Sequence, residues 1–463
     1  MRSSATAEVA TGAGWRTAVA LATGSAAFAL SVAVLFPGWM SYDSSFQFWQ
    51  VRTGEFSNLS PVVMTALWSV VHAVAPRPSA LFLLHQAAYW TGIVLLALAL
   101  WRGAAARAAF IVVAGFVPPV FVILGHLWTD ASLIAALSLA FGLTVTGLVR
   151  RQRLSLALAV PAIIYAGAVR HNSLLAIVPL SALWAHAWLR AGADGRVTAP
   201  VRSRRAKLAG LALLLVFASF AGGRALDQGL ARERVSTWAL LALWDLAGIS
   251  LDAGTLVVPA FAQQPDTTLE SVRAKYTPYS CVPLFEGPGR VRHGLGDELF
   301  GADELAALRR AWLGAIVTHP KSYLRHRAAM AKNQFGSYRG HLEGLFFIPA
   351  TVAYRDNPPG EATLTGWRDR LVEGVRRTRG WVIFTPAVYL VIAFGAAALG
   401  WRRRDELAGQ VALAFAGSGL LLVLPLVVAA PGTELRYCGW LFTASVVALT
   451  AGFARPVPRD AWA

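Results

Sequence analysis

Charged residues are scarce in this sequence, and acidic residues are the scarcest of them. Asp, Glu, Lys and Arg make up 14% of the 463 residues, whereas apolar residues make up 56%. A soluble globular chain has about a quarter of its residues charged, so the composition argues against one. Several uninterrupted apolar runs are long enough to cross a hydrocarbon core of roughly 30 Å as helices. The sequence therefore predicts an all-α, polytopic transmembrane helical bundle.

Cysteine and the short motifs of catalysis are also nearly absent. The two cysteines, Cys281 and Cys438, do not have the spacing of metal ligands. A disulfide between them and two free thiols are both open interpretations. No His-Glu-x-x-His pair, Asp-x-Asp pair or glycine-rich phosphate loop occurs. We therefore predict no cofactor and no metal site built by the protein, although the sequence leaves a divalent ion open.

The basic excess is an orientation signal and does not indicate nucleic-acid binding. Lys and Arg number 42 against 25 Asp and Glu, a formal net charge of +17. These basic residues gather in short clusters between the apolar runs, as membrane proteins keep them on the cytoplasmic side. The clusters lie within residues 102–107, 150–153, 190–207, 402–404 and 455–459. We assign all five, and the N-terminus, to the cytoplasm and expect no nucleic-acid partner.

Ten apolar segments satisfy this assignment with both termini inside. They are residues 17–36, 80–101, 108–125, 131–149, 154–169, 173–189, 208–223, 381–400, 408–430 and 437–453. The short apolar piece 62–75 is interpreted as interfacial or re-entrant, because an eleventh crossing would put several arginine clusters on the wrong side. The predicted domains are an N-terminal transmembrane module (1–223), an extracytoplasmic insertion (224–380) and C-terminal transmembrane helices (381–463).

The remaining charged residues at the membrane boundary fall on the outer face by the same count. They come from four places in the chain: Asp43, Asp130, the triplet Arg170-His171-Asn172, and Glu434 with Arg436 and Tyr437. Since none of them is needed for orientation, their convergence indicates a site that faces the outer leaflet.

The stretch 38–61 is the most informative of these. A helix that starts after Ser41 places three rings on one face and three polar side chains on the other: Tyr42, Phe46 and Trp49 against Asp43, Gln47 and Gln50. This pattern predicts a helix in the membrane interface, anchored by its rings, that offers the Asp43 carboxylate and the Gln47 amide to water. The alternative for Asp43 is a merely solvated acid or a helix-dipole partner.

Each of the other candidates also has two interpretations. Asp130, in a Trp-Thr-Asp sequence before an apolar run, is a helix cap or a functional acid. Arg170 is a clamp for a lipid-linked phosphate or a side chain that reaches anionic headgroups. Arg436 breaks the positive-inside pattern, which favours a phosphate or a carboxylate as its partner. Asp245, within the insertion, is by default an interfacial polar residue.

The order of these elements resembles the GT-C superfamily of membrane glycosyltransferases, which includes protein O-mannosyltransferases and the lipid A aminoarabinose transferase. The similarity covers mainly residues 17–189. It comprises a first helix, an outer loop with an acid in an interfacial helix, a short apolar segment after Pro61, and a helix hairpin that ends in an outer acid. The resemblance implies that Asp43 is the catalytic base or positions the acceptor, that Asp130 is the second outer acid, and that the donor is a sugar on a polyprenyl phosphate.

The sequence departs from the family pattern in two places. Asp43 is followed by Ser44 and Ser45 where a second acid is usual, and Ser60 stands where some members place a lysine before the proline. Another cation must then meet the donor phosphate, and Arg170 and Arg436 are the expected substitutes. The full predicted substrate-binding set is Gln47, Asp130, Arg170, His171, Asn172, Glu434, Arg436 and Tyr437.

The expected function is therefore inverting transfer of a sugar to a glycan, lipid or protein acceptor on the extracytoplasmic face of the cell membrane. A lipid or polysaccharide transporter is the main alternative, but it should carry inverted repeats and ionisable groups near the bilayer midplane. A polysaccharide ligase or polymerase of another fold is the third interpretation, and it would not need the Asp43 element.

Overall fold

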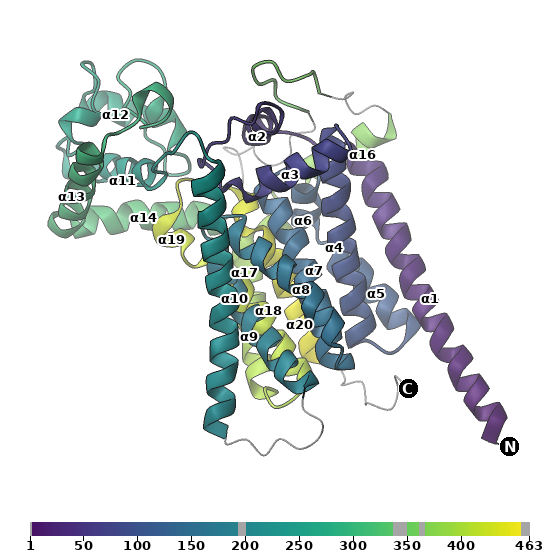
Figure 1. Cartoon of the computed structure of the whole chain (residues 1–463). Helices are drawn as coiled ribbons and strands as arrows, with labels where there is room; N and C mark the ends of the chain where they lie inside the picture. Colours follow the sequence, from purple (N-terminus) through teal and green to yellow (C-terminus); the bar gives the residue numbers. More distant parts are fainter. Residues whose placement is uncertain (1, 193–200, 337–349, 361–365, 455–463) are drawn as a thin grey trace.

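The computed structural model describes residues 2–192, 201–336, 350–360 and 366–454, and these residues form helices and no β-strand. Most of the helices form an elongated bundle (Figure 1). Its long members are α1 (Arg2–Leu35), α4 (Pro78–Leu100), α7 (Thr129–Arg150), α8 (Arg153–Ala168), α9 (Ser173–Ala191), α10 (Val201–Leu230), α17 (Pro386–Arg402), α18 (Leu407–Val423) and α20 (Gly439–Phe453). The predicted all-α fold class is confirmed.

Among the described residues, six helical segments are long and apolar enough to cross a membrane: Gly14–Leu35, Pro78–Leu100, Thr129–Arg150, Ser173–Ala191, Ser203–Leu230 and Leu407–Ala429. A seventh results if α5 (Ala104–Gly115) and α6 (Pro118–Leu124) count as one span. These two helices are bent by 64°, so the segment predicted to cross over 108–125 is either a broken span or a re-entrant loop. Pro118 and Pro119 explain the break, because a proline disfavours helical backbone in the residue before it.

Small residues let the central helices of the bundle approach closely. Gly92 on α4 faces α7, and a Cβ there would lie 2.2 Å from the carbonyl carbon of Ser138. Gly142 meets α4 in the same way, 2.7 Å from the Gly92 carbonyl oxygen. Such contacts are typical of membrane helices, which gain stability from close packing rather than from expelling water. They fix the start of α7, which carries Asp130.

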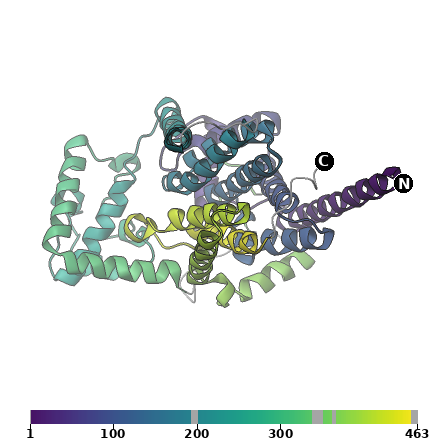
Figure 2. The same ribbon diagram turned by 90° about the horizontal axis from the view of Figure 1, so that it is seen from below.

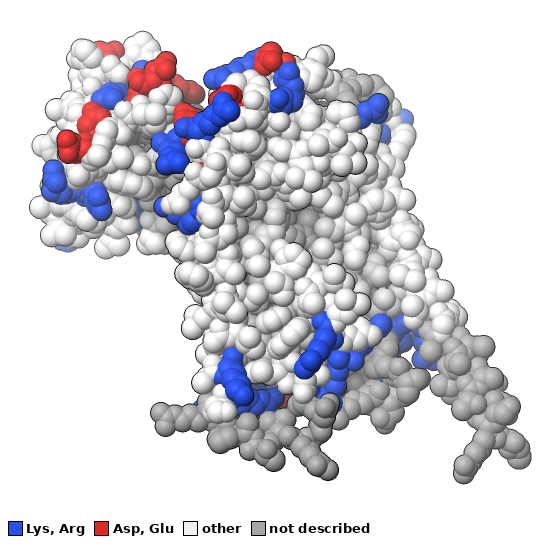
Figure 3. Space-filling model, in the orientation of Figure 1, with Lys and Arg blue, Asp and Glu red and all other residues white. Residues whose placement is uncertain are grey.

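Charge is distributed along the bundle as expected for a membrane protein. On the face seen in Figure 3, Lys and Arg gather at the lower end, both signs occur at the upper end, and a wide belt between them has almost none. An uncharged belt between two charged ends is the surface that a bilayer requires. The chain is therefore described below as a multi-pass membrane protein.

Two short helices cross the upper end of the bundle. They are α2 (Tyr42–Thr53) and α3 (Val62–Val74), and α3 runs across the end of the neighbouring long helices instead of alongside them (Figure 1). With 13 residues, α3 is also too short to span roughly 30 Å at 1.5 Å per residue. The connection from α2 to α4 is thereby kept at one end of the bundle.

A separate group of helices lies beside this upper end. It contains α11 (Trp238–Ala253), α12 (Leu269–Lys275), α13 (Ala302–Thr318) and α14 (Pro320–Phe335), within the predicted insertion (Figures 1 and 2). These helices bury their own apolar cluster, which includes Leu243, Leu246, Val272, Leu284 and Leu308. A short helix further along, α16 (Trp367–Arg377), returns to the upper end of α1 (Figure 1).

Candidate functional site

A cavity of about 410 Å³ is lined by the chain just before α3, by α19 (Leu426–Ala429) with Pro431, and by five further segments that are far apart in the sequence. They are α2, the start of α7, the turn between α8 and α9, the short helix η5 (Leu435–Cys438) and the start of α11. Eight of the nine predicted site residues line the cavity: Asp43, Gln47, Asp130, Arg170, His171, Asn172, Arg436 and Tyr437. The ninth, Glu434, forms an ion pair with Arg436. The sequence thus identified residues that the fold brings together, and their roles remain predictions.

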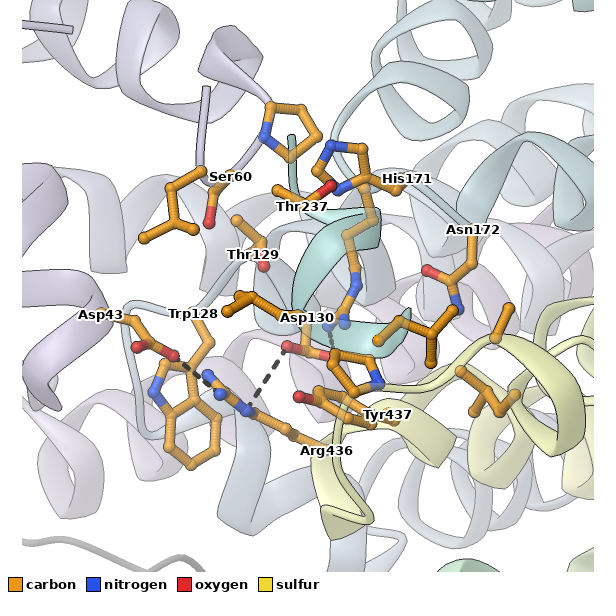
Figure 4. A pocket seen from close by; sticks show the side chains of 18 of the residues that line it. Asp43, Ser60, Trp128, Thr129, Asp130, His171, Asn172, Thr237, Arg436 and Tyr437 are labelled. Atoms are coloured by element: carbon orange, nitrogen blue, oxygen red, sulfur yellow. Dashed lines mark hydrogen bonds and ion pairs between the residues drawn. The ribbon is translucent and has the colours of Figure 1, made fainter. Parts of the chain in front are cut away.

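Arg436 is the centre of this group, with Asp43 and Asp130 pointing toward it (Figure 4). Its Nη2 lies 2.7 Å from Asp43 Oδ2, and its Nε lies 4.0 Å from Asp130 Oδ2 and also pairs with Glu434. The side chain is only 12% exposed. Burial alone would lower the pKa of Arg436, but Glu434 and Asp43 outweigh it and hold that pKa well above its usual value. Arg436 is therefore a permanent cation.

Arg170 is the second cation of the cavity. It forms an ion pair with Asp130, whose side chain is 4% exposed, and its guanidinium carbon lies 5.0 Å from the centroid of the Tyr437 ring. Burial and the neighbouring Arg436 lower the pKa of Arg170 to about 10, so it is still charged at neutral pH. Asp130 does not cap its helix, because α7 begins at Thr129 after Trp128 and no side-chain cap bond forms. The capping interpretation is wrong, and the acid serves the ion pair.

The formal charges of the cluster do not balance. Three carboxylates (Asp43, Asp130 and Glu434) face two guanidinium groups (Arg170 and Arg436), which leaves one negative charge in excess. Asp130 is 4% exposed and Glu434 17%, whereas Asp43 is 52% exposed. Asp43 is therefore the acid of the three that a molecule arriving from solution meets first.

The polar face of α2 differs from the prediction. Gln47 and Gln50 were expected to face water, but they are 3% and 2% exposed. The Gln50 side chain accepts a hydrogen bond from the Ser57 N–H at 2.9 Å and so fixes the chain after the helix. Gln47 lines the inner side of the cavity instead. The reason is that α2 packs against α3 on the side opposite to Tyr42, Phe46 and Trp49. Only the start of the polar face of α2, at Asp43, is therefore open to solvent.

The ring face of α2 has a partner within the protein, and its predicted contact with lipid stays a prediction. Tyr42, Phe46 and Trp49 pack against Tyr354, at ring-centroid distances of 5.3, 5.5 and 6.1 Å. Nothing near position 42 in the sequence could have indicated this partner, since Tyr354 lies about 300 residues away.

Trp128 is a site residue that the sequence analysis missed. Its ring lies 4.9 Å from the guanidinium carbon of Arg436, a favourable cation–π distance. The Trp128 indole N–H donates to the Ser41 hydroxyl at 2.8 Å, and the ring stacks on His126. Its place two residues before Asp130 was the signal that could have found it.

The insertion holds the loop that carries Arg436. From α14, Arg327 Nη1 donates to the Ala430 carbonyl oxygen at 3.3 Å, and Gln334 Nε2 donates to that of Glu434 at 3.0 Å. Arg327 is fixed in turn by Asp245, with Nη2 and Oδ2 2.6 Å apart. Asp245 is completely buried, so its default interpretation as an interfacial residue is wrong. A buried ion pair such as that of Asp245 and Arg327 is costly to break. It therefore strongly disfavours movement of α14 away from the loop that carries Arg436.

Both cysteines are buried and carry free thiols. Cys438 lies beside the cavity loop, with its Sγ 3.2 Å from Gln334 Nε2. Within the described residues, no group of three or more His, Cys, Asp or Glu side chains is arranged to hold a metal ion.

The geometry described here is that of a half-exposed carboxylate facing two buried guanidinium groups across a cavity at one end of a membrane bundle. Compared with known proteins, the chain matches no protein-family model, no curated protein and no solved structure.

Proposed function

We propose that this protein is a membrane glycosyltransferase that moves a sugar from a polyprenyl-phosphate donor to an extracytoplasmic acceptor with inversion at the anomeric carbon. The proposal includes ten crossings, both termini in the cytoplasm and the cavity on the outer face. The observation that carries it is the contact of Asp43 with Arg436 at the mouth of a cavity that also contains Arg170. A base and two anion-binding groups are the parts that such a transfer needs.

In this reaction Asp43 accepts the proton of an acceptor hydroxyl as the hydroxyl oxygen attacks the anomeric carbon. The bond between that carbon and the phosphate oxygen breaks on the opposite side, and the lipid phosphate leaves with the electron pair. Arg170 and Arg436 stabilise the charge that develops on the phosphate, since guanidinium groups bind phosphate oxygens through two hydrogen bonds. The burial of both arginines strengthens this effect because less water screens it.

The excess negative charge of the cavity gives the order of events. A donor phosphate adds at least one negative charge to a cluster that already carries one in excess. It therefore binds well only if Arg436 exchanges a carboxylate for the phosphate. Asp43 is the half-exposed partner of Arg436, so it is the easiest to release. Release makes Asp43 available as the base at the moment when the donor is in place.

The position of the cavity disfavours the transporter alternative. Its lining comes from α2, helix ends and connecting turns at one end of the bundle, whereas a transported substrate is expected to bind near the bilayer midplane.

The test is to incubate the purified protein, in lipid nanodiscs, with radiolabelled sugars on polyprenyl phosphate and with an acceptor mixture from cell envelopes. We expect release of the lipid phosphate from at least one donor, and a product whose anomeric configuration is opposite to that of the donor. A product of retained configuration refutes the mechanism. Movement of the intact donor between leaflets of a liposome, with no release of lipid phosphate, refutes the enzyme and supports a transporter.

A further inference from the structure

A group of aromatic rings lies on the face of α2 that does not line the cavity, and most of its members are half-buried. We call Tyr42, Phe46, Trp49 and Tyr354 the aromatic platform; its rings lie 5.3 to 6.4 Å apart between centroids of contacting pairs. Tyr42, the residue before Asp43, is 60% exposed. A tyrosine ring this exposed, packed against a second ring that also has an arginine beside it, is a candidate contact surface.

The platform is held rigidly although its two parts are far apart in the sequence. The segment 350–357 crosses α2 through backbone contacts: the Val352 N–H donates to the Met40 carbonyl oxygen at 2.8 Å, and the Ser45 hydroxyl donates to that of Val352 at 2.7 Å. The Asn357 amide donates to the Ser45 carbonyl oxygen at 2.7 Å. Tyr354 therefore has a fixed position over the rings of α2, as a binding surface requires.

Charges around the platform indicate that it faces water. Arg52 pairs with Asp356 at 3.3 Å, and Asp356 is 68% exposed. Arg355 lies over the platform, with its guanidinium carbon 4.1 Å from the Trp49 ring centroid. The elements also lie at the far upper end of the molecule, beyond α3 (Figure 1). Exposed charged groups of both signs thus flank the platform at the end of the bundle.

A sugar ring is the ligand that this combination fits. A pyranose has one face of slightly positive C–H groups, and an aromatic ring has a negative face, so the two attract each other. The hydroxyl groups around the pyranose need donors and acceptors at the edge of the rings. Arg355 and Asp356 provide both kinds, because Arg donates and Asp accepts. Rings with a few polar groups at the rim are the usual composition of a small-molecule site.

We propose that the aromatic platform is the subsite for a pyranose residue of the acceptor, next to the position where Asp43 takes up its proton. The proposal rests on the function proposed above and adds the chemical class of the acceptor: a saccharide, or a conjugate that already carries one. Tyr42 and Tyr354 contact the sugar, and Asp43 directly follows Tyr42 in the sequence, with its carboxylate on the cavity side of α2.

The experiment measures saccharide binding in the absence of donor, so that it does not depend on transfer. The protein in nanodiscs is titrated with a panel of manno-, malto-, cello- and N-acetylglucosamine oligosaccharides, and binding is followed by calorimetry. We expect the wild type to bind at least one of them, and Tyr42→Ala and Tyr354→Ala to weaken that binding about tenfold or more. Trp381→Ala removes another exposed ring, 61% exposed and outside the cavity, and should leave binding unchanged.

Three results overturn the inference. The first is that the wild type binds no oligosaccharide, and the second is that Trp381→Ala weakens saccharide binding as much as Tyr42→Ala does. The third is strong quenching of the Trp49 fluorescence by lipids brominated in the acyl chain. The last is read as the fluorescence difference between wild type and Trp49→Phe, and it would place the rings in the membrane. Asp43→Asn separates this inference from the proposed function, because it should abolish transfer and leave saccharide binding intact. If the protein binds saccharides but transfers no sugar from any donor, the proposed transferase function is refuted and the inference that the aromatic platform binds a saccharide stands.

Discussion

Replacing Asp43 with Asn gives the sharpest test of the proposed chemistry, because the structure separates its effect on activity from its effect on stability. The side chain is 52% exposed, so its ion pair with Arg436 contributes only about 0–1 kcal/mol to folding. The amide of Asn occupies the same volume but does not accept the proton of a hydroxyl group. Loss of a general base lowers a rate by about 100- to 10,000-fold, which corresponds to roughly 2.7–5.4 kcal/mol of the barrier.

The same substitution should not weaken donor binding. It removes one of three carboxylates from a cavity that holds two guanidinium groups, so the formal charge of the cluster changes from −1 to zero. Arg436 is then free for the donor phosphate without an exchange of partners. We therefore expect Asp43→Asn to have a much lower kcat, and a KM for the donor equal to or below that of the wild type.

The assay is release of lipid phosphate from a radiolabelled donor, with unfolding measured on the same preparations. Asp252→Asn is the matched control, since Asp252 forms an ion pair with Arg325 at 2.9 Å outside the cavity. It should keep wild-type kcat and KM. An Asp43→Asn protein with kcat within threefold of wild type would show that Asp43 is not the base. A lower kcat together with a raised KM for the donor would refute the charge argument.

Three further predictions follow from the burial of particular groups. Arg170→Gln leaves Asp130 buried with only the 4.0 Å contact to Arg436, so it should lower the free energy of unfolding by about 3 kcal/mol. Asp130→Asn in the same chain should restore most of that loss. No restoration would contradict the pairing of Asp130 with Arg170. Because both native thiols are buried, a membrane-impermeant maleimide should label Tyr42→Cys but not Arg151→Cys in intact cells, and labelling at 151 would invert the topology. Burial lowers the pKa of His326 below its ordinary value of 6.5, so on acidification the unfolded chain takes up a proton that the folded chain does not. Stability should be constant above that pH and fall below it, and His326→Gln should reduce this slope in thermal unfolding.

The composition of the site was predictable because it follows from charge and chain parity. By the predicted count of crossings, Arg436 lies on the side where a membrane protein rarely keeps an arginine, so a partner was expected. The structure provides Asp43, Glu434 and Asp130. Membrane helices return their connecting loops alternately to the two sides, and each loop on one side is therefore near the others. A count of crossings was enough to place Asp43 and Asp130 together although the helices between them were not known in detail.

The orientation of side chains was not predictable, because it depends on packing between distant segments. The prediction of a helix at α2 was correct. However, Gln50 is buried by Ser57 and the chain beyond it, and Trp49 is covered by Tyr354 and Arg355. Asp245 carries no local signal for its burial, since its partner Arg327 lies 82 residues further along the chain. Periodicity assigns a face to a residue, and tertiary contacts decide what that face meets.

The 64° bend between α5 and α6 is a different case, because its signal was present in the sequence. Pro118 and Pro119 stand in the middle of an apolar run, and a hydropathy window averages over them. Both prolines lack an N–H, and they leave carbonyl groups of the preceding turn without their helical donors. Backbone of this kind is tolerated at membrane depth where protein covers it. Here Tyr89 on α4 is buried and donates its hydroxyl to the Gly115 carbonyl oxygen at 2.9 Å.

The insertion and the bundle together determine how Arg436 can move. Its backbone loop is held on one side by Gln334 and Arg327 of α14, and its guanidinium rests on Trp128 of the bundle. With both ends of the residue fixed, exchange of Asp43 for a phosphate requires that the ligand come to the arginine. The mobile partner in the proposed reaction is then the half-exposed carboxylate, which turns toward the acceptor when it is released. Binding of the donor and activation of the base are in this way a single event, set by one ion pair at the mouth of the cavity.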